Sequence, residues 1–250
     1  MSRTYGPSRR VGVIGGMGPA ATIRLYEQIT RRTPIRREQD HLRLVIDSDP
    51  TVPDRTAALL AAANSDGKPS LPAADVEGSP ERHLIAAARR LQAAGVELIA
   101  VACNTAHAWH DRIGSAVDVP VLHLIDVTAD AAARRVGPGG QVGLLATLGT
   151  QAAGLYQHAT ARIGLDLVLP EPQTQQQVME AIMQVKTGQT EPARVTIHRA
   201  GRQLVACGAA AVIVGCTDIS VVLADGDLDV PVVDSTVALA ERIIDLARTG

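Results

Sequence analysis

The sequence is poor in aromatic residues, with no Phe, one Trp (Trp109) and three Tyr among 250 residues. The core must therefore be built from Ala, Val, Leu and Ile, and no aromatic platform is available on which nucleic-acid bases stack. The formal net charge is only −2, which offers no basic surface for a polyanion. These absences argue against a nucleic-acid partner.

Long hydrophobic runs are also missing. The sequence has no stretch of about 18 consecutive apolar residues, and its basic N-terminus lacks the apolar segment of a signal peptide. We therefore expect a cytoplasmic protein with no membrane partner. Cysteines are few and odd in number, and no C-x-x-C pair occurs among Cys103, Cys207 and Cys216. Free thiols are expected, rather than disulfides or a structural zinc site.

The sequence does contain short Val-, Ile- and Leu-rich runs that alternate with stretches of helical period. These runs cover residues 11–15, 42–46, 97–102, 119–124, 141–146, 165–169, 210–215 and 230–234. Continuous apolar strands between helices are typical of parallel sheets that are covered on both faces, so the predicted class is α/β. Residues 47–83 are rich in Pro, Gly and Asp, and we expect a long segment without regular structure, either a functional loop or lid or a flexible insertion.

Two segments of the chain recur later in the same order. VGVIGGMGPAATIRLY (residues 11–26) resembles VGLLATLGTQAAGLY (142–156), and AGVELIAVACNT aligns without gaps on CGAAAVIVGCTD. A Val-Pro strand follows each cysteine motif. The repeat predicts two similar α/β units, each of which delivers one thiol, Cys103 or Cys216, from the same structural position.

Each of these two cysteines is predicted to lie where a strand ends and a helix begins, the edge at which open parallel sheets bind ligands. A thiol at a helix N-terminus should have a lowered pKa and act as a base or a nucleophile. Thiols on opposite sides of one carbon would allow racemisation or epimerisation, because one removes the α-proton and the other returns a proton. The alternative is a hydrolase with one nucleophilic thiol and His107, four residues after Cys103, as its base. Asp218 would either orient Cys216 or cap a helix.

The turn GGMGPAAT matches G-x-G-x-x-A after a strand, so a dinucleotide such as NAD is an alternative ligand. However, the repeat copy keeps only Gly149 and has Thr147 and Thr150 instead, and no acidic residue closes a second strand about 20 residues on. A loop whose backbone N–H groups hold a carboxylate explains both copies better. This interpretation makes Gly16, Met17, Thr147 and Thr150 candidates for substrate binding.

The motifs GVIGGMGPAAT, VACNTAH, GLLATLGTQAAGLYQ and VGCTDIS resemble those of the cofactor-independent Asp/Glu racemases, and within them the aspartate racemase branch. The resemblance covers nearly the whole chain. It implies two pseudo-symmetric domains, each a parallel sheet flanked by helices, with the active site between them. We expect one domain to comprise residues 1–124 plus 231–250, with a C-terminal helix, and the other to comprise residues 125–230.

The resemblance also implies racemisation of aspartate, with glutamate second, by two bases and without pyridoxal phosphate, metal or another cofactor. By motif match, Cys103 and Cys216 are the two acid/base thiols. The polar site residues that the resemblance places beside them are Asn104, Thr105 and Thr217. Family relatives are often dimers, so a homodimer is expected.

Two basic residues match motifs whose cations bind carboxylates, Arg55 in VPDRT and Lys186 in AIMQVKTG. A dicarboxylic amino acid needs such cations, and Arg offers a bidentate fork. The chain departs from the second cysteine motif at Asp218 and Ser220, where relatives commonly have Glu and Pro, which leaves the substrate preference open. A cysteine-dependent isomerase or decarboxylase of a dicarboxylate, or a non-catalytic ligand-binding relative, stays as an alternative.

Overall fold

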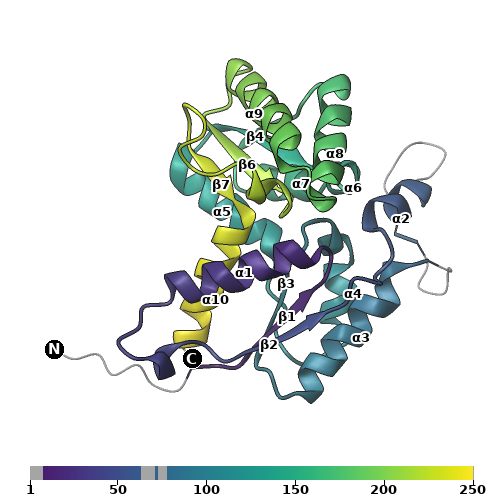
Figure 1. Cartoon of the computed structure of the whole chain (residues 1–250), viewed down its shortest axis with the longest axis vertical. Coiled ribbons are helices and arrows are strands. Elements are labelled where there is room, and N and C mark those ends of the chain that lie inside the picture. The colour runs from purple at the N-terminus through teal and green to yellow at the C-terminus, as the bar shows by residue number, and fades with distance from the viewer. Residues whose placement is uncertain (1–7, 63–70, 73–77, 250) are drawn as a thin grey trace.

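Two parallel sheets form the centre of the molecule in the computed structural model, which describes residues 8–62, 71–72 and 78–249 (Figure 1). The first sheet has the order β2-β1-β3, with β1 (Val11–Gly15), β2 (Leu44–Ser48) and β3 (Leu98–Val101). The second has the order β5-β4-β6-β7, with β4 (Gln141–Ala146), β5 (Asp166–Val168), β6 (Ala211–Gly215) and β7 (Val232–Asp234). All paired strands are parallel. The predicted α/β class is confirmed.

Helices connect the strands in both halves. Up to the second sheet they are α1 (Pro19–Arg32), η1 (Glu38–Asp40), α2 (Arg55–Ala61), α3 (Pro80–Ala93), η2 (Thr105–Trp109), α4 (His110–Gly114) and α5 (Leu124–Val136), where η denotes a 3-10 helix. The later helices are α6 (Leu148–Ala152), α7 (Leu155–Arg162), α8 (Pro172–Lys186), α9 (Thr190–Ala206), η3 (Ile219–Val221) and α10 (Ser235–Arg248). None of the helices in the described residues has both the length and the apolar character needed to cross a membrane.

Strand residues alternate between apolar clusters on the two faces of a sheet. In β1, Val13 packs in one cluster with Leu25 of α1 and Ile243 of α10. Its neighbour Ile14 packs in another cluster with Leu84 of α3. Because successive side chains of a strand point to opposite faces, the first sheet is buried on both sides. This double burial explains why the strands are continuous apolar runs rather than alternating ones.

The two halves repeat one arrangement. β1 and β4 are central, and each pairs with the next strand in the chain and with a strand that ends beside a cysteine, β3 or β6. The strand predicted at residues 119–124 is wrong in extent, because it forms a single bridge between Ile99 and Val121 before α5 begins. Its counterpart β7 has three residues in register with β6.

The segment at residues 47–83 contains regular structure, so the prediction of an irregular loop is wrong for its described part. α2 and the start of α3 lie within it. Asp54 caps α2, because its side chain accepts a hydrogen bond from the Ala57 amide. Residues 63–70 and 73–77, which belong to the predicted loop or lid, lie outside the described residues.

The last strand and the last helix of the chain join different halves. β7 pairs with β6 in the second sheet, whereas α10 packs against α1 and the first sheet. In Figure 1, α10 (yellow) runs from the second half down beside α1. The division into residues 1–124 plus 231–250 and residues 125–230 stays a proposal, with one refinement: strand pairing assigns residues 232–234 to the second half.

Candidate active site

A cavity of about 280 Å³ lies between the two halves, at the carboxyl ends of four strands. Its lining includes Met17 after β1, Cys103 after β3, Thr147 after β4 and Cys216 after β6. This edge is where parallel α/β sheets bind ligands. The cavity therefore brings the two sequence-predicted thiols and the two Gly- or Thr-containing turns to one place.

Two helices close the sides of this cavity. α2 and its cap contribute Asp54, Arg55, Thr56, Ala57 and Leu60. α8 contributes Met179, Ile182, Met183 and Lys186. The α8 residues follow the spacing i, i+3, i+4, i+7 and so lie on one helix face. This spacing is visible in the sequence, and it could have identified the apolar wall that ends in the lysine.

Both thiols are nearly buried, and each cysteine keeps 6% of its surface exposed. No α-helix follows them directly, because Cys103 leads into η2 and Cys216 into η3. Such short 3-10 turns supply little of the helix dipole on which the predicted pKa lowering depended. Instead, burial and then the Asp218 carboxylate raise the pKa of Cys216 to about 12. The predicted lowering is therefore wrong for Cys216, which is a neutral thiol at pH 7.

Asp218 links Cys216 to Lys186. Its Oδ2 lies 2.5 Å from Lys186 Nζ, and the Cys216 thiol donates to the same oxygen at 3.8 Å. Burial lowers the pKa of Lys186, but the Asp218 carboxylate outweighs this effect and the net shift is upward. The Asp218 side chain makes no capping hydrogen bond at η3. Of the two roles that the sequence left open, the geometry favours orientation of the thiol.

The Arg55 guanidinium is held by main-chain oxygens. Its Nη1 donates to the carbonyls of Val52 and Pro53, both at 2.9 Å, and its Nη2 donates to the Met17 carbonyl at 3.2 Å. The Nε atom is buried without a hydrogen-bond partner, and no carboxylate in the described part of the chain forms an ion pair with Arg55. A half-buried cation in a cavity without a counter-ion favours an anionic ligand.

Three threonine hydroxyls form a triangle across the two halves. Thr105 lies 2.9 Å from Thr147 and 3.0 Å from Thr150, and Thr147 lies 3.0 Å from Thr150, all between Oγ1 atoms. Thr147 also caps α6 by accepting from the Thr150 amide. Thr105 and Thr147 line the cavity, whereas Thr150 is fully buried and does not. The hydroxyl of Thr150 has two protein partners in this triangle, and its predicted substrate contact stays a prediction.

Asn104 and Thr217 directly follow the two cysteines, and both line the cavity. The Asn104 amide donates to Ser235 Oγ at 3.1 Å and accepts from the Tyr156 hydroxyl at 2.7 Å. Asn104 thereby joins the first half to α7 and α10, with one amide hydrogen left for a ligand. Sequence reasoning missed Tyr156 and Ser235, because nothing in the spacing of the sequence indicates these long-range contacts.

His107 is not placed as a base for the Cys103 thiol. Its Nδ1 lies 2.8 Å from the main-chain oxygen of Cys103, and its Nε2 accepts from the Leu124 amide at 3.0 Å. The proton must therefore be on Nδ1. Burial, together with the nearby His123, lowers the pKa of His107 to about 3, so the ring is neutral. The hydrolase alternative, in which His107 activates the thiol, is wrong, and His107 supports the turn instead.

Gly16, a predicted substrate-binding residue, is not among the residues that line the cavity. Its amide donates to Thr22 Oγ1 at 2.8 Å, so it is not available to a carboxylate or a dinucleotide phosphate. Glycine is required here because φ is +88° and an added Cβ would lie 2.4 Å from the backbone of Asp49. The neighbouring Met17 does line the cavity.

We expect Gly16→Ala to destabilise the fold by at least about 2 kcal/mol more than Gly164→Ala. Gly164 also has a positive φ, +71°, but nothing lies within 4 Å of its added Cβ. The control variant therefore carries only the backbone cost of about 1–2 kcal/mol. Denaturant unfolding followed by circular dichroism measures both losses. Equal losses would contradict the steric argument.

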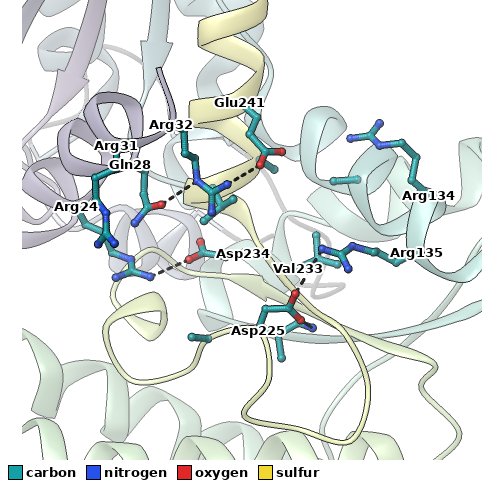
Figure 2. Close-up of a pocket in the computed structure, with 15 residues that line it drawn as sticks. Arg24, Gln28, Arg31, Arg32, Arg134, Arg135, Asp225, Val233, Asp234 and Glu241 are labelled. Carbon is teal, nitrogen blue, oxygen red and sulfur yellow. Dashed lines mark hydrogen bonds and ion pairs between the residues drawn. The ribbon is translucent and has the colours of Figure 1, made fainter. Parts of the chain in front are cut away.

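No group of three or more His, Cys, Asp and Glu side chains is arranged to hold a metal ion within residues 8–62, 71–72 and 78–249. The same residues contain a second hollow, a groove of about 630 Å³ between α1, α5 and α10 (Figure 2). Its charged residues are Arg24, Arg31, Arg32, Arg134, Arg135, Asp225, Asp234 and Glu241. Most of them pair with one another, and no cysteine lines the groove. The thiol chemistry therefore belongs to the smaller cavity.

Two similar α/β halves with a two-cysteine cavity between them are the arrangement that the sequence resemblance implies for an isomerase of the racemase class. Comparison with known proteins confirms this class. Residues 14–243 match the family described as Asp/Glu/hydantoin racemase, and the chain belongs to this family. The resemblance noted in the motifs is thus confirmed, and the protein is an amino-acid racemase.

Three relatives illustrate the match. An aspartate racemase from Picrophilus torridus is 32% identical, with a TM-score of 0.81 over 96% of this chain and 94% of that chain. An aspartate racemase homologue from Pyrococcus horikoshii OT3 is 27% identical, with a TM-score of 0.73 over 96% and 99%. The broad-specificity amino-acid racemase RacX of Bacillus subtilis is 27% identical over 164 residues, which are 66% of this chain and 70% of that protein.

Proposed function

We propose that the protein racemises an acidic amino acid, aspartate first and glutamate second, by proton transfer between Cys103 and Cys216 without a cofactor. One observation carries the proposal: the repeat-related thiols line one small cavity. One thiolate takes the proton from Cα, and the thiol on the opposite side then donates its proton to the resulting carbanion. The two sulfurs end with their protonation states exchanged.

The charges around the cavity support a dicarboxylic substrate. Arg55 has no counter-ion among the described residues, and its buried Nε lacks a partner. Lys186 is already paired with Asp218, so we propose that a second substrate carboxylate shares this lysine. The apolar side chains of α8 would contact the short methylene chain. A substrate with one carboxylate would leave one of the two cations unused.

The neutral state of Cys216 gives it the first role of acid. Burial and the Asp218 carboxylate raise its pKa, so the protonated thiol predominates at pH 7. Cys216 is therefore ready to donate a proton in the direction in which Cys103 is the base. The reverse direction needs the Cys216 thiolate, and the positive charge of Lys186 lowers the pKa of that thiol. Lys186 would thus serve both substrate binding and the return reaction.

Incubation of each aspartate enantiomer in deuterated water tests the proposal. We expect each to give the opposite enantiomer with deuterium at Cα, because the returned proton comes from a thiol that exchanges with solvent. Chiral chromatography with mass spectrometry measures both the inversion and the label. Maleate and a substituted malonate serve as comparison substrates. Their turnover, without α-proton exchange in aspartate or glutamate, would favour the alternative dicarboxylate isomerase or decarboxylase.

Three further expectations from the sequence stay predictions. They are the assignment of the substrate-binding residues, the homodimer and the cytoplasmic location. Sedimentation of the purified chain would measure its oligomeric state, and cell fractionation would measure its location. A non-catalytic ligand-binding relative would bind aspartate, seen as a rise in Tm, without any exchange of its α-proton.

A further inference from the structure

Each cavity cysteine begins a short turn, here called its thiol turn. The residue four positions after the cysteine connects this turn to the start of a helix by hydrogen bonds, and we call this connection a tie. In the first half this residue is His107, whose Nε2 accepts a hydrogen bond from the amide of Leu124, the first residue of α5. Its Nδ1 donates to the carbonyl of Cys103 itself. One buried ring therefore joins the Cys103 turn to the start of α5.

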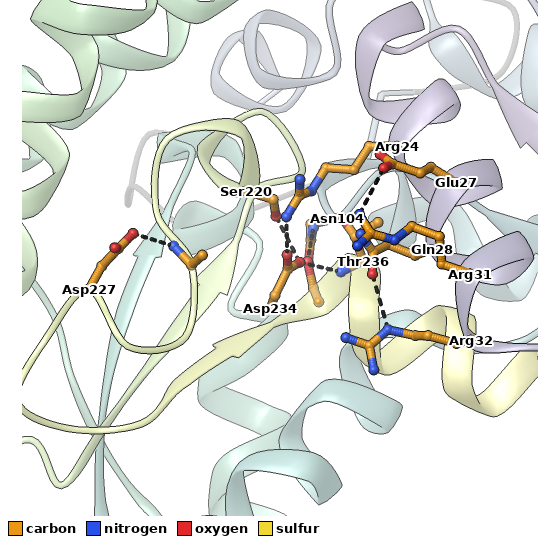
Figure 3. A network of polar contacts seen from close by, with 12 residues as sticks. Arg24, Glu27, Gln28, Arg31, Arg32, Asn104, Ser220, Asp227, Asp234 and Thr236 are labelled. Carbon is orange, nitrogen blue, oxygen red and sulfur yellow. Dashed lines mark hydrogen bonds and ion pairs between the residues drawn. The ribbon is translucent and has the colours of Figure 1, made fainter.

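In the second half the corresponding residue is Ser220, which is 2% exposed. Its hydroxyl donates to Asp234 Oδ1 at 2.7 Å. Asp234 is the N-cap of α10, and the same oxygen accepts from the Thr236 amide at 2.7 Å. The other carboxylate oxygen pairs with Arg24 of α1 at 3.3 Å. Figure 3 shows these side chains converging on Asp234.

The two ties occupy equivalent places in the repeat. α5 begins five residues after Val119 of the first Val-Pro pair, and α10 begins five residues after Val230 of the second. Both helices start where the chain passes between the halves, because α5 leads to the second sheet and α10 returns to the first. Both halves thus connect the thiol turn to a helix start. The first half uses the His107 imidazole, and the second uses the Ser220 hydroxyl together with the Asp234 carboxylate.

The start of α10 also reaches the Cys103 turn. Ser235, next to Asp234, accepts a hydrogen bond from Asn104, the residue after Cys103. Consecutive residues at one helix start therefore contact both thiol turns. Ser235 is fully buried, whereas Asp234 is 8% exposed and lies in the wall of the groove between α1, α5 and α10.

We propose that His107 and Ser220 are positioning residues, each of which fixes one thiol turn against the start of a helix that crosses between the halves. The inference rests on the proposed two-thiol racemisation. Proton transfer at a carbon requires close alignment, and a displacement of about 1 Å can cost up to 10²-fold in rate. The Asn104–Ser235 hydrogen bond does not involve the Ser220 hydroxyl, so each tie should control the thiol of its own half and leave the other thiol in place.

Inversion rates alone cannot separate the two sides. The equilibrium constant between enantiomers is one, so kcat/KM must stay equal in the two directions whichever thiol is displaced. A substrate with a β-leaving group reports one side at a time. When a thiolate removes the α-proton of 3-chloroaspartate, the electron pair forms the Cα–Cβ double bond and the carbon–chlorine bond breaks. Chloride is released without any proton donation from the opposite thiol.

The test compares Ser220→Ala and His107→Asn with the wild type on the two enantiomers of threo-3-chloroaspartate. The Asn side chain can still reach the Cys103 carbonyl from the Nδ1 position, but it cannot reach Leu124. We expect each variant to slow chloride release about tenfold for one enantiomer and to leave the other within about twofold, with opposite enantiomers affected. Ser220→Thr, which keeps the hydroxyl, should restore the wild-type pattern.

Thr33→Val is the matched control, because it removes another buried hydroxyl, which donates to the Ile29 carbonyl at the end of α1, away from the cavity. It should leave the rate of chloride release from both enantiomers unchanged. Equal slowing of both enantiomers by Ser220→Ala or by His107→Asn, or slowing of the same enantiomer by both variants, overturns the positioning role. If the wild type neither exchanges the α-proton of an acidic amino acid nor releases chloride, the proposed function itself fails.

Alkylation by iodoacetamide provides a second readout that needs no substrate. Cys207 is exposed and serves as the internal reference, whereas Cys103 and Cys216 are buried. We expect Ser220→Ala to raise the labelling of Cys216 relative to Cys207 about tenfold, because the freed turn opens more often. His107→Asn should do the same for Cys103 alone. Peptide mass spectrometry measures the three sites, and equal changes at both buried thiols contradict the inference.

Discussion

Replacing Cys103 by Ala is expected to lower the rate of aspartate inversion by on the order of 10³-fold, because acid–base groups contribute about 10²–10⁴-fold. Cys216→Ala should have a similar effect. Each reaction direction uses one sulfur as base and the other as acid, so loss of either sulfur blocks both directions. Chiral chromatography of the products measures the loss, with thermal unfolding to verify that the variants are folded.

The same two variants should differ in a one-sided reaction. Chloride release from 3-chloroaspartate needs only the base, so each variant should retain the release from one enantiomer and lose it from the other. Cys103→Ala and Cys216→Ala should retain opposite enantiomers. Cys207→Ala is the control, since Cys207 is exposed and does not line the cavity, and it should match the wild type. Residual inversion above about a tenth of the wild-type rate in either site variant would rule out the two-thiol mechanism.

The second large effect is expected from Arg55→Lys, which keeps the charge but removes the guanidinium fork. Three hydrogen bonds to main-chain oxygens are lost, together with the free Nε–H that faces no protein partner. Hydrogen bonds to charged groups contribute about 1.5–3 kcal/mol, which corresponds to roughly a 10- to 10²-fold weaker substrate binding. We expect KM for aspartate to rise by on the order of 10²-fold, with a smaller fall in kcat.

Arg31→Lys is the matched control for this substitution. Arg31 pairs with Glu27 on the exposed face of α1, and its side chain is 72% exposed. Its kinetic constants should therefore be those of the wild type. A KM for Arg55→Lys within about twofold of the wild type would show that Arg55 serves only to hold the Val52 and Met17 carbonyls. Steady-state kinetics with both enantiomers would measure the difference.

The fold was largely predictable because its signals are local. Apolar runs, helical spacing and the Val-Pro pairs can each be detected within a short segment of sequence. The parallel sheets and the equivalence of Cys103 and Cys216 could therefore be predicted from them. α2 was missed because its seven residues lie among Pro, Gly and Asp, and its cap at Asp54 is a single side chain. Short helices of this kind depend on tertiary packing more than on pattern.

The finer chemistry of the site was less predictable, because it depends on where side chains separated in sequence meet. The lowered thiol pKa assumed an α-helix after Cys216, but the chain forms a 3-10 turn and places Asp218 beside the sulfur. His107 was expected near the thiol, and four-residue spacing does bring it to the Cys103 turn. The spacing could not show that the ring would bond to the carbonyl and to Leu124 instead.

The return of α10 to the first half constrains the order in which the chain can fold. Leu239, Ile243 and Ile244 complete the apolar cluster that also contains Leu25 and Leu98. During synthesis these residues emerge after every strand of both sheets, so one face of the first sheet stays uncovered until α10 emerges. The first half is therefore completed only after the second sheet has been made, and removal of residues 235–249 should trap an aggregation-prone chain even though every cavity-lining residue is still present.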